Sequence, residues 1–153
     1  MNFDLSLPME AERLVPHRSS LCLVKSLLEF SGQTGTVESV IEPDNIFLEE
    51  DGGLPCLALV ELIAQASAAV KGYDDLRQGK EIKRGFLVDI REIQFMGKCF
   101  KGDRPRIRIE ILRTISGFSV INGEVEINGR IIATGMLKLW VPEDSDTKDK
   151  TEG

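Results

Sequence analysis

Hydrophobic and polar residues alternate with a period of two through most of the second half of the chain. Such alternation predicts β-strands with one buried face. The predicted strands are Gly85–Phe95, Arg106–Ile115, Phe118–Ile127 and Arg130–Val141. Asn128-Gly129 is a strong signal for a hairpin turn between the last two, and Ser116-Gly117 is a weaker signal between the middle two. The second half therefore predicts an antiparallel sheet.

The first part of the chain predicts a short helical turn followed by a hairpin. Met9–Leu14 is expected to form the turn, which Pro16 ends. Leu21–Phe30 and Gly35–Glu42 are predicted strands, and the polar residues Ser31-Gly32-Gln33 turn the chain between them.

The run Leu54–Tyr73 has a different pattern, because it is apolar almost throughout and long enough for a helix. Pro55 suits the first turn of that helix, and Gly72 is expected to end it. One carboxylate, Glu61, lies in the run, one turn before the amide of Gln65. A carboxylate on an apolar helix is costly to bury unless it has partners. Glu61 is therefore the leading candidate for a functional residue.

The order of these elements predicts an α+β fold in which one curved antiparallel sheet wraps one long central helix. Residues 1–141 are expected to form a single domain. Residues 142–153 carry no large apolar side chain and are expected to form a disordered polar tail. A helix that is apolar on most sides needs cover on most sides, so a partner subunit is expected to cover what the sheet leaves open.

Composition excludes several classes of protein. The net charge of −6 argues against general nucleic-acid binding. His17 is the single histidine, and the three cysteines have no paired spacing, so neither a zinc site nor another metal site is expected. Unpaired cysteines suit a reducing cytoplasm. The glutamate within the apolar helix argues against a membrane span.

Several motifs, in this order, resemble those of the 3-hydroxyacyl-[acyl carrier protein] dehydratases. Leu14-Val15-Pro16-His17-Arg18 with Leu21-Cys22-Leu23-Val24 resembles that family's Leu-Pro-His-Arg-x-x-x-Leu-Leu-Val opening. Pro55–Gln65 resembles its Pro-Gly-x-x-x-x-Glu-x-x-Ala-Gln helix, with Cys56 in place of glycine. Gly85–Phe95 and Lys101-Gly102-Asp103 are similar to its next strand and its Pro-Gly-Asp turn. The resemblance covers roughly residues 10–141 and implies a hotdog fold and a homodimer or a larger assembly of dimers.

One departure from the family is large. Its catalytic histidine lies in a Gly-His-Phe-Pro-Gly stretch before the helix, whereas this chain has Asn45–Gly53, with Ile46 or Phe47 near the histidine position. This loop is more similar to a divergent branch of dehydratase-like proteins associated with aryl-polyene-type lipid pathways.

The resemblance implies roles for particular residues. Dehydration of a 3-hydroxyacyl thioester needs a base at C2 and an acid at the C3 hydroxyl, which in the family are a histidine and a helix carboxylate from different subunits. Glu61 would be the acid, because burial on an apolar helix raises a carboxyl pKa. Gln65 would orient Glu61, and backbone N–H groups near Cys56 and Leu57 would receive the thioester carbonyl.

Other residues have more than one interpretation. His17 corresponds to a family residue other than the catalytic histidine, so it either orients groups near the site or satisfies backbone groups near the first strand. Cys56 at the start of a helix is either an activated thiol or a small residue in a glycine-like position. No cofactor is expected.

Three functions remain open. The first is a dehydratase of 3-hydroxyacyl thioesters, carried by acyl carrier protein or coenzyme A. The second is a hotdog thioesterase, in which Glu61 activates water. The third is an acyl-thioester binder, or an inactive subunit paired with an active homologue. An acidic carrier protein could contact a run of basic residues, namely Lys83, Arg84, Lys98, Lys101, Arg104, Arg106 and Arg108.

Overall fold

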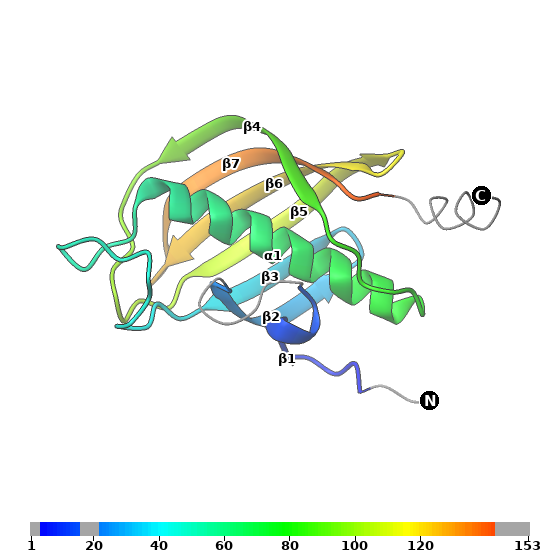
Figure 1. Cartoon of the computed structure of the whole chain (residues 1–153), viewed down its shortest axis with the longest axis horizontal. Helices are drawn as coiled ribbons and strands as arrows, with labels where there is room; N and C mark the ends of the chain where they lie inside the picture. The colour runs from blue at the N-terminus through cyan, green and yellow to red at the C-terminus, as the bar shows by residue number, and fades with distance from the viewer. Residues whose placement is uncertain (1–3, 16–21, 143–153) are drawn as a thin grey trace, which may run out of the picture.

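The computed structural model describes residues 4–15 and 22–142, which form one long helix and a sheet (Figure 1). The elements in chain order are β1 (Met9–Glu10), the 3-10 turn η1 (Ala11–Arg13), β2 (Val24–Ser31), β3 (Thr34–Ser39), α1 (Cys56–Arg77), β4 (Phe86–Phe95), β5 (Arg106–Ile115), β6 (Phe118–Ile127) and β7 (Arg130–Trp140).

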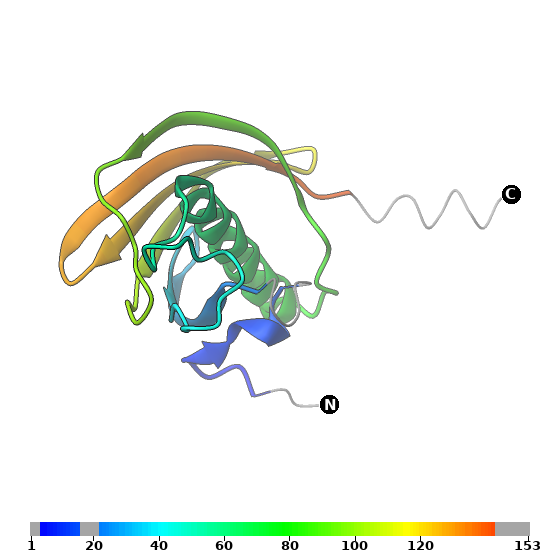
Figure 2. The same ribbon diagram turned by 60° about the vertical axis from the view of Figure 1, so that its left-hand side comes forward.

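All strand pairs are antiparallel, and the strand order across the sheet is β1-β2-β3-β5-β6-β7-β4. Figure 2 shows the sheet curling around α1, with β4 and β7 arching over one side of the helix. The predicted α+β architecture, one helix wrapped by a curved antiparallel sheet, is confirmed.

The four strands predicted in the second half are also confirmed, each to within one residue. Both hairpin turns have the left-handed backbone that two-residue connections favour. The φ values are 51° and 82° at Asn128 and Gly129, and 51° and 84° at Ser116 and Gly117. The Ser116-Gly117 sequence was the weaker signal, yet it forms the same kind of turn.

The helix continues five residues beyond the predicted end at Gly72. Gly72 is needed for packing rather than for termination, because a Cβ at this position would lie 2.2 Å from the carbonyl oxygen of Leu14. After it, Tyr73 is buried and donates a hydrogen bond of 2.8 Å to the carbonyl of Leu5. The polar connector is therefore shorter than predicted.

Other boundaries also differ from the prediction. The first predicted strand begins at Val24, and its partner ends at Ser39 rather than at Glu42. The predicted helical turn near Met9 divides into a two-residue strand and a 3-10 turn. The predicted tail lies almost wholly outside the described residues.

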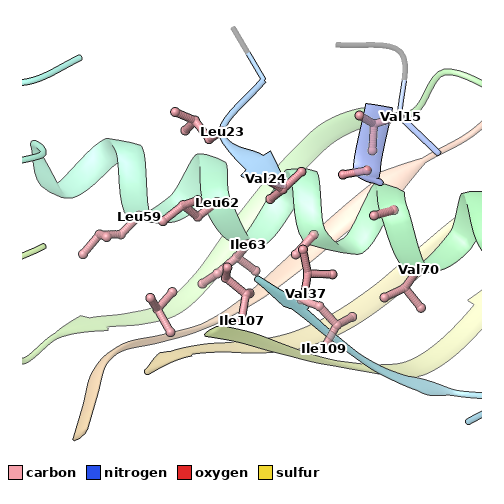
Figure 3. Packing of buried hydrophobic residues seen from close by; sticks show 14 of the residues in the cluster. Val15, Leu23, Val24, Val37, Leu59, Leu62, Ile63, Val70, Ile107 and Ile109 are labelled. Atoms are coloured by element: carbon pink, nitrogen blue, oxygen red, sulfur yellow. The ribbon is translucent and has the colours of Figure 1, made fainter. Parts of the chain in front are cut away.

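Close packing between α1 and the sheet depends on two glycines. A Cβ on Gly123 would lie 2.4 Å from Ile63, and a Cβ on Gly35 would lie 2.5 Å from Val70. Figure 3 shows Ile63 and Val70 on the sheet side of the helix, with Ile107, Ile109 and Val37 beneath them. The core therefore lies between one side of α1 and the inner face of the sheet.

The helix α1 is long and apolar enough to cross a membrane by length and composition alone. However, 67% of its most apolar window is buried inside the fold. That burial is what a core helix shows, and it accounts for the apolar sequence without a membrane.

Candidate functional site

One stripe of α1 is covered only in part by the sheet. Its residues follow a spacing of three and four, so they lie on one helical face. They are Leu57, Glu61, Ala64, Ala68, Lys71 and Asp75. All except Leu57 are half-buried, and Leu57 is 75% exposed. We call this set the open stripe. Within a single subunit, this side of the helix is therefore left partly exposed, as the sequence predicted.

Glu61 is held from the helix side by a chain of hydrogen bonds. Gln65 Nε2 donates to Glu61 Oε2 at 2.9 Å, and Gln65 Oε1 accepts from the backbone N–H of Leu23 at 2.7 Å. The carbonyl of Leu23 in turn accepts a hydrogen bond from the Ser39 hydroxyl. Gln65 is 1% exposed, so its amide is fixed by the segment that leads into β2. The carboxylate of Glu61 thereby has a defined orientation on the open stripe.

A pocket of about 130 Å³ lies beside Glu61, between the open stripe and the strands β4 and β7. Its lining residues are Glu61, Ala64, Ala68, Lys71, Gly72, Asp75, Lys83, Gly85, Leu87, Leu139 and Val141. The small helix residues leave the room, and the strands supply apolar walls. Glu61 lies at the end of the pocket nearer the N-terminus of α1. The charged side chains of Lys71, Asp75 and Lys83 lie at the opposite end.

The charged end of the pocket contains Asp75, whose pKa is shifted in opposite directions by burial and by nearby lysines. Partial burial raises the pKa of Asp75 above its ordinary value, while the nearby Lys71 and Lys83 pull it down. Burial is the largest cause, so the ionised carboxylate is less stable here than in water. The pocket therefore has one carboxylate at each end.

The start of α1 has an uncapped first turn. Pro55 occupies the N-cap position with extended backbone and makes no side-chain cap. Cys56 and Leu57 are both exposed, so their backbone groups lie at an accessible helix N-terminus. Neither residue lines the pocket beside Glu61.

The loop before α1 places no candidate base beside Glu61. Phe47 is half-buried and packs against the hydrophobic core, and its backbone N–H is fixed by Asn45 Oδ1 at 2.8 Å. Further along the loop, Lys98 Nζ pairs with Asp51 at 2.7 Å and Glu49 at 3.2 Å. These contacts lower the pKa of Asp51 and raise that of Lys98, chiefly through their mutual hydrogen bond. The loop is therefore anchored without a histidine.

His17 lies outside the described residues. Over residues 4–15 and 22–142, no three His, Cys, Asp or Glu side chains group closely enough to hold a metal ion. Cys99 is fully buried, and burial raises its thiol pKa to about 12, which makes it an unreactive packing residue.

Sequence reasoning missed the strand side of the pocket. Leu87, Leu139 and Val141 were predicted as strand residues, but only the curl of the sheet brings them to α1. The open stripe had a usable signal, because its residues recur at helical spacing. The link from Gln65 to the Leu23 backbone had none, since the two lie 42 positions apart.

The edge strand β4 is exposed on both faces. Only Asp89 and Ile93 are half-buried, although the strand is apolar. Exposed apolar side chains on and just after it are Phe86, Leu87, Val88, Ile90, Phe95 and Met96. A long apolar strand at a free edge invites another chain to pair with it.

The basic run found in the sequence is partly neutralised. Arg108 pairs with Glu124 and Glu126, and Arg104 approaches Glu38 at 3.6 Å. Lys98 is paired as described above. The predicted basic run is therefore not a continuous positive surface.

These features define a dehydratase-like protein of the hotdog fold. A model of the ApeP-like family, described as ApeP dehydratase, matches residues 9–150. The chain belongs to this ApeP-like dehydratase family, and the predicted likeness to 3-hydroxyacyl-[acyl carrier protein] dehydratases is confirmed.

Individual relatives agree with this assignment. The 3-hydroxyacyl-[acyl-carrier-protein] dehydratase FabZ of Campylobacter curvus is 27% identical over 141 residues, covering 87% of this chain and 95% of the relative. The dehydratase heterocomplex ApeI:P from Xenorhabdus doucetiae contains a chain with a TM-score of 0.84 and 21% identity, covering 95% and 99% of the two chains.

Thioesterase-like proteins share the fold more distantly. A hypothetical thioesterase from Streptococcus pneumoniae, solved with coenzyme A, has a TM-score of 0.58 and 16% identity, covering 75% of this chain and 86% of that one. This likeness concerns the fold alone and gives the thioesterase hypothesis little support.

Proposed function

We propose that this chain is one subunit of a two-subunit dehydratase of 3-hydroxyacyl thioesters, in which Glu61 is the general acid. The main support for this proposal is that a carboxylate with a fixed orientation lies beside an accessible pocket. Glu61 is oriented by Gln65 beside a pocket on the open stripe, while Phe47 occupies the loop region where the family has its base.

The base would come from a partner subunit with the same fold. The open stripe and the exposed β4 edge are adjacent features that one hotdog partner would cover together, by pairing strands and laying its helix beside α1. The Xenorhabdus relative is described as a heterocomplex, which supports a homologous but different partner. A homodimer would place a second copy of Phe47, rather than a base, near Glu61.

The reaction would then divide between the two subunits. The partner's histidine takes a proton from C2 of the substrate, and the electron pair of that C–H bond forms the C2–C3 double bond. The C3–O bond breaks, and the proton of Glu61 goes to the departing hydroxyl, which leaves as water. The proton on the histidine must pass to Glu61 to restore the starting state, so no cofactor is consumed.

The pocket suits this substrate class. An acyl chain would lie against Ala64, Ala68, Leu87 and Leu139, which are small or apolar. The thioester could be carried by acyl carrier protein or by coenzyme A. The uncapped N–H groups at Cys56 and Leu57 remain candidates to receive a thioester carbonyl, in this subunit's site or in the partner's.

The test is to reconstitute activity with a partner that cannot supply its own acid. A homologous dehydratase subunit from the same organism would keep its loop histidine but carry glutamine in place of its helix carboxylate. Mixed with this chain, it should dehydrate a 3-hydroxyacyl thioester, whereas neither protein alone should do so at a comparable rate. Glu61→Gln in this chain should then reduce turnover by ~10²–10⁴-fold.

The control is the fold of the variant. Glu61→Gln preserves the side-chain shape, so the circular dichroism spectrum and the mass of the mixed complex should stay as in the wild type. Full turnover by the Glu61→Gln mixture would remove Glu61 from the mechanism. Full turnover by this chain alone would show that a base from the partner is not required.

A further inference from the structure

An aromatic cluster lies on the outer face of the sheet, at the end where β4 begins and β7 ends. Trp140 on β7 is paired in register with Phe118 on β6 and Phe86 on β4. The ring centroids of Trp140 lie 6.0 Å from those of Phe86 and 6.3 Å from those of Phe118. Leu139 is buried against the core, so its neighbour Trp140 faces away from the helix.

The outer residues of this cluster are exposed, while Trp140 between them is half-buried. Phe86 and Phe118 are 44% and 38% exposed, and Ile115, in register with Phe118, is 59% exposed. We call Phe86, Ile115, Phe118 and Trp140 the aromatic patch. Contiguous apolar surface of this kind marks an interaction site more often than single exposed residues do.

Cations surround the aromatic patch. Lys138 Nζ lies 4.8 Å from the Phe118 ring centroid, and Arg84 Cζ lies 5.7 Å from that of Phe86. Arg113 belongs to the next row of the sheet, together with Val120 and Lys138. The acid in this row is Asp89, which is paired with Arg91 at 2.8 Å and also lies near Lys138, its register partner. The rim is therefore positive on a chain whose net charge is −6.

The aromatic patch adjoins the end of the pocket that lies away from Glu61. Lys83, Gly85, Leu87, Leu139 and Val141 line the pocket, and each is a chain neighbour of Arg84, Phe86 or Trp140. The patch and the pocket thus lie on opposite faces of the sheet, at the start of β4 and the end of β7. A ligand held on the patch could pass a flexible arm around this sheet end toward Glu61.

We propose that the aromatic patch is the docking surface for the protein that delivers the substrate, a small acidic carrier with its acyl chain on a thioester arm. This rests on the proposed function, because it assumes that a thioester reaches Glu61. Acidic side chains of the carrier meet the cationic rim and its apolar residues cover the rings. Complementary charge accelerates and orients such an encounter. Within the basic run read from the sequence, acids neutralise Lys98, Arg104 and Arg108, whereas Arg84 of the same run belongs to the cationic rim.

The experiment measures binding, with no need for turnover. Acylated carrier protein is titrated into this chain, in its complex with the partner subunit, by fluorescence anisotropy. The double variant Arg113→Glu/Lys138→Glu should weaken binding at least tenfold, and Phe118→Ala should weaken it as well. Lys101→Glu changes an exposed lysine far from the patch in the fold and should stay within twofold of the wild type. Added salt should weaken the wild-type complex.

Several results would overturn the proposal. The carrier could bind the double variant as tightly as the wild type, or Lys101→Glu could weaken binding equally. The double substitution could instead change the mass of the assembly, which would assign the patch to a second copy of a subunit. Should the double variant fail to fold, Arg113→Glu alone, on an exposed side chain, gives the same comparison.

The two proposals fail separately. If Glu61 is not the acid, carrier binding by the patch is unaffected. If the patch does not bind the carrier, dehydration of a short acyl-pantetheine thioester by the complex still proceeds through Glu61.

Discussion

The two sides of helix α1 differ both in composition and in surroundings. On the sheet side, Ile63 and Val70 are fully buried and fit against glycines of the sheet. On the other side, the open stripe is lined by alanines, a glutamate and a lysine–aspartate pair, with a pocket instead of packed side chains. The first side stabilises the subunit, and the second keeps space for a partner and a substrate. The difference shows that the small and charged residues within an apolar run, at helical spacing, mark the side that the sheet does not fill.

Truncation on the closed side should have the largest effect on stability. Ile63→Ala leaves a cavity against Gly123 and should cost about 2–5 kcal/mol of unfolding free energy, measured by urea denaturation. Leu57→Ala, at the exposed start of the same helix, is the matched control and should cost far less. Equal losses at the two positions would mean that the two sides of α1 do not differ as described.

Gln65 joins the two sides, so its variants should separate folding from chemistry. Gln65→Leu leaves the backbone N–H of Leu23 without its acceptor and should cost about 1–3 kcal/mol. Gln65→Glu keeps an acceptor for Leu23 but cannot donate to Glu61 when ionised. It also places a second carboxylate beside Glu61 at a buried position, so its cost in stability should fall as the pH drops, and it should shift the pH–rate profile of the reconstituted complex. An unchanged profile would show that Gln65 does not position Glu61.

A charge on the open stripe should affect assembly more than folding. Ala68→Arg changes a half-buried residue at the pocket, so the subunit should stay folded, with a loss of unfolding free energy of about 1 kcal/mol. Assembly with the partner should be lost, and size-exclusion chromatography with light scattering would measure this as a smaller mass. Glu81→Arg, on the exposed connector after α1, is the control. Intact assembly of the Ala68→Arg protein would place the interface elsewhere.

The smallest effect is expected from Asp75. Burial raises its pKa in the folded subunit, so above that pKa the ionised form destabilises the fold relative to a neutral side chain. Asp75→Asn should raise the melting temperature slightly at pH 7, and the gain should vanish as the pH falls below the ordinary aspartate range. A lower melting temperature at pH 7 would show that the attraction of Lys71 and Lys83 outweighs burial.

The sequence by itself determined the elements and the main candidate. Alternation defined β5 and β6 to the residue, because one buried face imposes a period of two. The apolar run with a single carboxylate identified Glu61, because such a residue is costly without partners. These are local properties that neighbouring residues carry.

Tertiary structure decided what depends on distant residues. Gly72 predicted the end of the helix, yet α1 passes through it, and the nearby Leu14 carbonyl, which leaves no room for a side chain, gives the glycine its reason. Part of the basic run became paired charges once β5 met β6 and the loops closed. The aromatic patch joins β4, β6 and β7, which only the sheet order brings together. Contacts between residues far apart in the chain leave no periodic mark in the sequence, so the fold alone reveals them.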